Sequence, residues 1–121
     1  MDKFNNIWAS PEFIESNNMK IIDIRTEFEW NQTGIVEGSH TITFFKENGS
    51  YNAEEFTKEL DRYVSKDEKF LLICRTGSRT GQVSSFINQH FGYNSISLNG
   101  GIMKLIGEGY RTTPYNHFNK N

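Results

Sequence analysis

The chain has 121 residues, a formal net charge of −2 and 36% hydrophobic residues, and ten of its residues are Phe. This length and composition predict one globular domain over residues 1–121, with a core at about residues 3–110 and a polar C-terminal tail. The near-neutral charge, without a basic tract, disfavours nucleic acid as a partner. No apolar run approaches the ~20 residues that span a bilayer, so we expect no membrane association.

The cysteine and histidine content favours a reducing compartment and no metal. A single cysteine, Cys74, cannot form a disulfide within the chain. Polar residues at Asp2, Asn5 and Asn6 interrupt any apolar segment near the N-terminus, so we expect no secretory signal and a cytoplasmic protein. The three histidines lack the spacing of metal ligands, and the sequence implies neither a metal nor an organic cofactor.

The first part of the chain predicts a strand, a helix and a second strand. Residues 3–8 indicate a short strand. Ser10-Pro11-Glu12 has the residues of a helix start, with Ser as the N-cap, Pro at the first helical position and an acid in the first turn. Asn17-Asn18 ends this helix. The apolar segment 19–24 then predicts a buried strand.

An acid interrupts that second strand. Because a buried carboxylate without a partner is costly, we expect Asp23 near the carboxyl end of the strand, where its oxygens accept hydrogen bonds. Thr26 and Glu29 have the spacing of a capping box and predict a helix over residues 27–32. Arg25 and Glu29 are close enough in sequence to form an ion pair across this turn.

A turn at residues 34–39 leads to a predicted third strand over residues 40–45, followed by a loop. Asn52 and Glu55 again have capping-box spacing and indicate a helix. The unbroken apolar run Phe70–Ile73 predicts a strand buried on both faces.

The remaining elements continue the alternation of strands and helices. A helix is expected from about residue 79 to residue 91, stopped by Gly92. Residues 94–98 predict a fifth strand, and a tight turn at 99–101 precedes a short helix over 102–106. Residues 116–121 are polar, and we expect them to be frayed. Strands that alternate with helices predict an α/β domain with a mainly parallel sheet.

Cys74 is expected at the carboxyl end of its strand, where ligands gather in parallel α/β sheets. The residues that follow it expose backbone N–H groups at the start of the next helix, and the helix dipole favours an anion there. Gly77 lets the backbone curl without steric cost. The alternative is that Cys74 is an ordinary buried apolar residue.

The side chains of the loop support the first interpretation. Thr76 and Ser78 add hydroxyl donors, and Arg75 and Arg79 add two positive charges. Each of these groups stabilises an anion, so we expect them to favour the Cys74 thiolate and to hold an oxyanion substrate against its sulfur.

The segment Cys74-Arg75-Thr76-Gly77-Ser78-Arg79 resembles the active-site loop of the rhodanese family of sulfurtransferases. Residues 22–25, followed by Glu29-Trp30, resemble the Asp-x-Arg and Glu-aromatic signature of that family. Residues 34–39 resemble its Gly-His-Ile-x-Gly-Ala turn, and residues 98–101 resemble its late Gly-Gly turn. The resemblance covers about residues 3–110. It implies one rhodanese module, with a mainly parallel five-stranded sheet and helices on both faces.

The sequence departs from this family pattern at two positions. Ile35 follows Gly34 directly, so the His of the turn motif is missing. Leu105 lies near the place where the family often has Trp. Both positions are structural or at the rim of the site in the family.

The resemblance implies a thiosulfate sulfurtransferase. Cys74 would be the nucleophile, which takes sulfur from an anionic donor, becomes a persulfide and passes the sulfur to cyanide or a thiol. The loop residues 75–79 would bind the donor and stabilise the persulfide. Asp23 and Arg25 would support the loop from the neighbouring strand.

Two alternatives belong to other classes. The module could be a persulfide relay that delivers sulfur to a protein partner, and the sequence does not separate this role from an enzyme. Phosphatases and arsenate reductases of the same fold have a longer loop, with five residues between Cys and Arg. Four residues separate Cys74 from Arg79, which favours sulfur transfer.

Overall fold

A computed structural model describes residues 6–115 of the chain. Residues 3–5 of the expected first strand and the expected frayed tail, 116–121, lie outside the described residues. Within this range strands and helices alternate, as the sequence predicts. The elements are β1 (Asn6–Trp8), α1 (Pro11–Ser16), β2 (Ile21–Asp23), α2 (Glu27–Thr33), β3 (His40–Thr41), α3 (Ala53–Leu60), β4 (Lys69–Ile73), α4 (Ser78–Phe91), β5 (Asn94–Asn99) and α5 (Gly101–Gly107).

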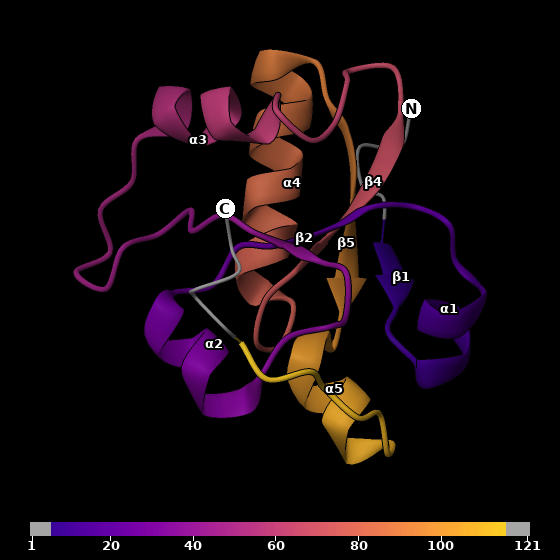
Figure 1. The fold of residues 1–121 in the computed structure, drawn as a ribbon. Coiled ribbons are helices and arrows are strands. Elements are labelled where there is room, and N and C mark those ends of the chain that lie inside the picture. Colours follow the sequence, from indigo (N-terminus) through magenta and orange to yellow (C-terminus); the bar gives the residue numbers. More distant parts are fainter. Residues whose placement is uncertain (1–5, 116–121) are drawn as a thin grey trace.

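The five strands form one sheet in the order β1-β5-β4-β2-β3, and every pairing is parallel (Figure 1). Strand β4 is the central strand. The last residue of β2, Asp23, lies opposite Ile73 of β4 and Thr41 of β3. The predicted α/β class and the predicted five-stranded parallel sheet are confirmed.

Helices cover both faces of the sheet, with a separate apolar cluster on each (Figure 1). Helices α3 and α4 contribute to one cluster, and α1 and α5 contribute to the other. Along β4 and the next residue, the side chains of Phe70, Leu72 and Cys74 point to the α3/α4 face, while Leu71 and Ile73 point to the opposite face. All five are fully buried, as predicted for a strand with both faces covered.

The third strand is shorter than predicted. The sequence predicts a strand over 40–45, but β3 includes only His40 and Thr41. Its partner β2 ends at Asp23, which leaves few residues to pair with. Residues 42–44 still run beside the segment that follows β2. The N–H groups of Ile42 and Phe44 donate to the carbonyl oxygens of residues 23 and 24.

The helix termini agree with their sequence signals. Thr26 and Glu29 form the complete capping box of α2, and the side chain of Asn52 accepts a hydrogen bond from the Glu55 N–H at the start of α3. Gly92 ends α4 in the left-handed region, with φ of 80°. No helix in the described range combines the length and the apolar character needed to cross a membrane.

Candidate active site

Cys74 directly follows β4 and is fully buried, with 0% of its surface exposed. Its Sγ accepts a hydrogen bond from the Gly77 N–H at 3.2 Å and lies 3.6 Å from the hydroxyl oxygen of Thr80. The strand end therefore places the sulfur between the turn of the loop and the first turn of α4. A backbone donor at this distance stabilises negative charge on sulfur.

The turn before α5 holds the loop in place. Three backbone N–H groups of residues 100–103 donate to three consecutive carbonyl oxygens of the loop: Gly100 to Thr76 at 3.0 Å, Ile102 to Cys74 at 2.9 Å, and Met103 to Arg75 at 3.1 Å. These bonds occupy donors at the start of α5 that have no acceptor within the helix. The conformation of the loop thus depends on a segment about 25 residues further along the chain.

Two glycines allow this close approach. Gly77 is the N-cap of α4 and has a φ of 105°, in the left-handed region. A Cβ at Gly101, whose φ is 60°, would lie 2.4 Å from the carbonyl oxygen of Arg75. Because that contact is with backbone, neither side can relax easily, and only glycine fits at position 101.

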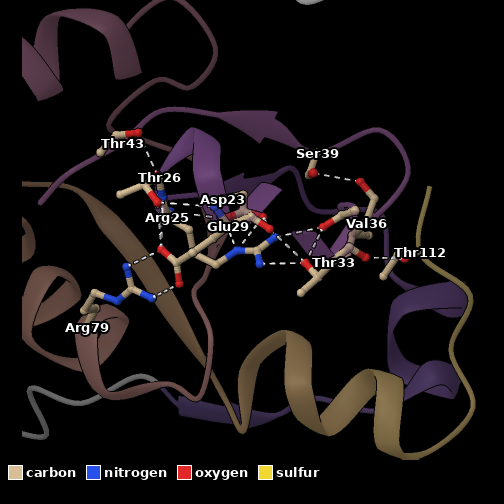
Figure 2. A network of polar contacts seen from close by, with 11 residues as sticks. Asp23, Arg25, Thr26, Glu29, Thr33, Val36, Ser39, Thr43, Arg79 and Thr112 are labelled. Atoms are coloured by element: carbon tan, nitrogen blue, oxygen red, sulfur yellow. Dashed lines mark hydrogen bonds and ion pairs between the residues drawn. The ribbon is translucent and has the colours of Figure 1, made fainter. Parts of the chain in front are cut away.

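Arg79 is held by an acid from another element (Figure 2). Its two terminal nitrogens donate to the two carboxylate oxygens of Glu29, at 3.0 and 2.7 Å. The same Glu29 completes the capping box by accepting from the Thr26 N–H. The predicted ion pair between Arg25 and Glu29 is therefore wrong, since Glu29 turns toward α4 and meets an arginine 50 residues away in the sequence.

The Glu29–Arg79 pair shifts the ionisation of both partners. Burial raises the pKa of Glu29, but the hydrogen bonds from Arg79 and from the Thr26 backbone outweigh it and lower that pKa to about 2. The hydrogen bond to Glu29 raises the pKa of Arg79, burial opposes it, and the negative charges of Glu29, Cys74 and Asp23 raise it further. The two groups remain a charged pair at neutral pH.

A second ion pair, between Asp23 and Arg25, is fully buried (Figure 2). Asp23 accepts from the backbone N–H of Arg25 at 3.1 Å and from its guanidinium at 2.8 to 3.2 Å. The guanidinium also donates to the Thr33 hydroxyl at 2.8 Å and to the Gly34 carbonyl at 3.0 Å. Asp23 thus finds its partners at the strand end, as expected. The guanidinium of Arg25 is directed at the turn after α2.

The remaining loop side chains face solvent. Arg75, Thr76 and Ser78 are exposed, while Gly77 and Arg79 are half-buried. Beside Arg79 lies an open hollow of about 460 Å³, and Cys74 does not line it. The hollow is lined by Thr26, Phe28, Glu29, Phe45, Lys46, Glu47, Gly49 and Arg79.

The family follows from comparison with known proteins. A family model described as "Rhodanese-like domain" matches residues 11–108. The chain belongs to the rhodanese-like domain family. This family covers sulfur transfer but also other activities. A search of curated proteins found no match.

Solved structures share the fold of this rhodanese-like domain. A rhodanese-related protein from Thermoplasma volcanium is 23% identical, with a TM-score of 0.68, over 89% of this chain and 98% of that one. A rhodanese-like domain protein from Staphylococcus aureus is 17% identical, with a TM-score of 0.66, over 91% and 99% of the two chains. CoADR-RHD from Bacillus anthracis is 24% identical, with a TM-score of 0.59, over 88% of this chain and 17% of that one.

Three residues of the site lie outside the loop residues singled out from the sequence. Glu29 holds Arg79, Thr80 contacts Sγ, and Ser97 lies 2.7 Å from the Thr80 hydroxyl. A sequence signal for Ser97 exists, since strand β5 alternates serines with apolar residues although it is buried on both faces. Within residues 6–115, no group of three or more His, Cys, Asp or Glu side chains could hold a metal ion.

A first prediction concerns the Gly101 contact. Gly101→Ala should lower the free energy of unfolding by about 2–4 kcal/mol, because the new Cβ meets the Arg75 backbone and φ is positive. Urea unfolding measures the change. Gly107→Ala, in the same helix with open space around it, should change stability by no more than about 1 kcal/mol. Equal effects of the two substitutions would contradict the assigned contact.

A second prediction follows from the lowered pKa of Glu29. The stability that its ionisation contributes is complete above about pH 4.5 and is lost as the pH falls toward about 2. The difference in unfolding free energy between wild type and Glu29→Gln should therefore shrink as urea unfolding is repeated at lower pH across this window. Glu37→Gln, at an exposed turn position, should follow the wild-type pH dependence. A difference for Glu29→Gln that is constant with pH would refute the pairing.

Proposed function

We propose that this protein is a sulfurtransferase that moves a sulfane sulfur from an anionic, thiosulfate-type donor to a thiophilic acceptor through a persulfide on Cys74. The observation that carries the proposal is the position of Sγ, which accepts the Gly77 N–H at 3.2 Å at the carboxyl end of the central strand. A backbone donor and the start of α4 favour the thiolate, which is the reactive form of the side chain.

The reaction has two displacement steps. In the first, the Cys74 thiolate attacks the outer sulfur of thiosulfate, a sulfur–sulfur bond forms on Sγ, and sulfite leaves with the electron pair of the broken bond. In the second, an acceptor such as cyanide attacks the outer sulfur of the persulfide, and Sγ leaves as a thiolate. Charge is conserved in each step, and no redox cofactor is needed.

The two loop arginines have different electrostatic roles in this proposal. Glu29 neutralises most of the charge of Arg79, so Arg79 acts on the site as one partner of a fixed pair. Arg75 is exposed on the loop, and its charge is available to an anion that approaches from solvent. We therefore assign donor attraction to Arg75.

Access to the sulfur requires movement of the loop. Cys74 is fully buried, whereas Arg75, Thr76 and Ser78 are exposed above it. A donor can contact Sγ only when part of this exposed segment shifts aside.

The central test is sulfur transfer by wild type and Cys74→Ser. Wild type should form thiocyanate from thiosulfate and cyanide, and Cys74→Ser should form none, because serine cannot carry the sulfur. Intact mass spectrometry after incubation with thiosulfate should show that wild type gains the mass of one sulfur atom. A wild-type protein that neither forms thiocyanate nor gains sulfur would refute the proposal.

The role of Arg75 is tested by steady-state kinetics. Arg75→Ala should raise KM for thiosulfate about tenfold and change kcat much less, because the lost attraction acts before the chemical step. Arg75→Lys keeps the charge and should recover most of the affinity. Added salt should raise KM for wild type and have little effect on Arg75→Ala. An unchanged KM in Arg75→Ala would show that this side chain does not bind the donor.

A further inference from the structure

Two buried hydroxyls lie in series behind the sulfur of Cys74. The Thr80 hydroxyl, in the first turn of α4, lies 3.6 Å from Sγ. The Ser97 hydroxyl, on β5, lies 2.7 Å from the Thr80 hydroxyl. All three residues are fully buried. The row Ser97–Thr80–Cys74 therefore reaches the sulfur through buried side chains.

The hydrogen atoms of this row allow two arrangements. When Cys74 is a thiol, S–H donates to Thr80, and the Thr80 hydroxyl can donate to the Gly77 carbonyl at 3.1 Å or to Ser97. When Cys74 is a thiolate, Ser97 can donate to Thr80, which frees the Thr80 hydrogen for the sulfur. Apart from the proton that leaves the thiol, only hydroxyl rotation separates the two arrangements, because each hydroxyl has one hydrogen and can also accept.

We propose that Thr80 is a further catalytic residue, which donates a hydrogen bond to the Cys74 thiolate, and that Ser97 is a positioning residue that orients the Thr80 hydroxyl for this donation. The proposal rests on the sulfur-transfer function proposed above. It adds that the site stabilises Sγ with two donors, the Gly77 N–H and the Thr80 hydroxyl.

The charge on Sγ differs between the two half-reactions, and this gives Thr80 a specific role. In the persulfide the negative charge is on the outer sulfur, and Sγ is neutral. Sγ regains the charge when the acceptor takes the outer sulfur and the sulfur–sulfur bond breaks. A hydrogen bond to Sγ therefore stabilises the leaving group of the second step, while it slightly quenches the nucleophile of the first.

A purely structural role of the Thr80–Ser97 contact would be to attach α4 to β5. A second contact between the same two elements provides a matched control for that role. Ser95, two residues before Ser97 on the same strand, is also fully buried, and its hydroxyl donates to Ser84 of α4 at 2.8 Å. Ser84 in turn donates to the Ser95 carbonyl at 3.1 Å. This second pair joins the same two elements without contacting Cys74.

Other charged groups around Cys74 are unchanged by the test substitutions. They come from the loop, from α4 and α2, and from the end of β2: Arg75, the Arg79–Glu29 pair and the Asp23–Arg25 pair. On α5, whose first turn donates to the Cys74 carbonyl, Lys104 is bonded to Glu108. A change in the ionisation of Cys74 can then be assigned to the hydroxyls.

The test is the pH dependence of alkylation of Cys74 by iodoacetamide, measured without any sulfur donor. Because Cys74 is the only cysteine, each rate reports on one thiol. The rate at high pH reports access to the sulfur, and the midpoint of the profile reports its ionisation. Thr80→Val, which removes the hydroxyl at similar size, should raise the midpoint by about one pH unit. Thr80→Ser should restore it.

The serine pair separates the proposed role from attachment of α4. Ser97→Ala should raise the midpoint by roughly half a pH unit, and Ser95→Ala should leave it unchanged, although both remove a hydroxyl bond between α4 and β5. If Thr80→Val does not fold, Ser97→Ala and Ser95→Ala still distinguish the proposed role from attachment of α4. Unchanged midpoints in Thr80→Val and Ser97→Ala, or equal shifts in Ser97→Ala and Ser95→Ala, would overturn the proposal.

The half-reactions give a second measurement. Single-turnover experiments are run at a pH above the alkylation midpoints of wild type and Thr80→Val. Under these conditions Thr80→Val should slow thiocyanate release from the persulfide about tenfold and change sulfite release by less than about threefold. Equal slowing of both steps would overturn the assignment to the leaving group. If wild type transfers no sulfur at all, the proposed function fails, while the alkylation profiles still test the hydroxyl row.

Discussion

The backbone of the Gly100–Gly101 turn lies directly against the backbone of Cys74 and Arg75, and the geometry of the thiol depends on this contact. The turn and the first residues of α5 supply three donors to the loop carbonyls, and the second glycine of the turn leaves no space for a Cβ. With its carbonyls bound on that side, the loop curls at Gly77 and directs one N–H at the sulfur. Without this contact, the carbonyls of residues 74–76 would need water, and only the bonds of Gly77 to α4 would hold the N–H at the sulfur.

Electrostatic neutralisation decides which charges remain for a ligand. Two carboxylates close to the loop are bound to arginines: Asp23 to Arg25, and Glu29 to Arg79. The first pair is fully buried and is directed at the turn after α2, and the second links α2 to the start of α4. Breaking the fully buried Asp23–Arg25 pair would leave a charge without its partner where water is excluded, which is costly. Arg75 is the loop arginine outside both pairs.

Sequence patterns were reliable where the deciding contacts are local. The apolar run Phe70–Ile73 predicted the central strand, because a strand covered on both faces needs no polar alternation. The capping box of Thr26 and Glu29 predicted the start of α2. The partner of Glu29 was not predictable in this way, since local spacing suggested Arg25 and the fold supplied Arg79. Ser97 was missed for the same reason, because it meets Thr80 only after β5 pairs with β4.

The pairing of β1 with β5 has a consequence for the order in which the protein is made. The first described strand has no neighbour until the last strand has been synthesised, and the loop after β4 has no anchor until residues 100–103 follow. During synthesis on the ribosome, β1 therefore stays unpaired until β5 has emerged. During that interval Cys74 lacks the contacts that shield it, and the thiol reaches its final surroundings among the last parts of the fold.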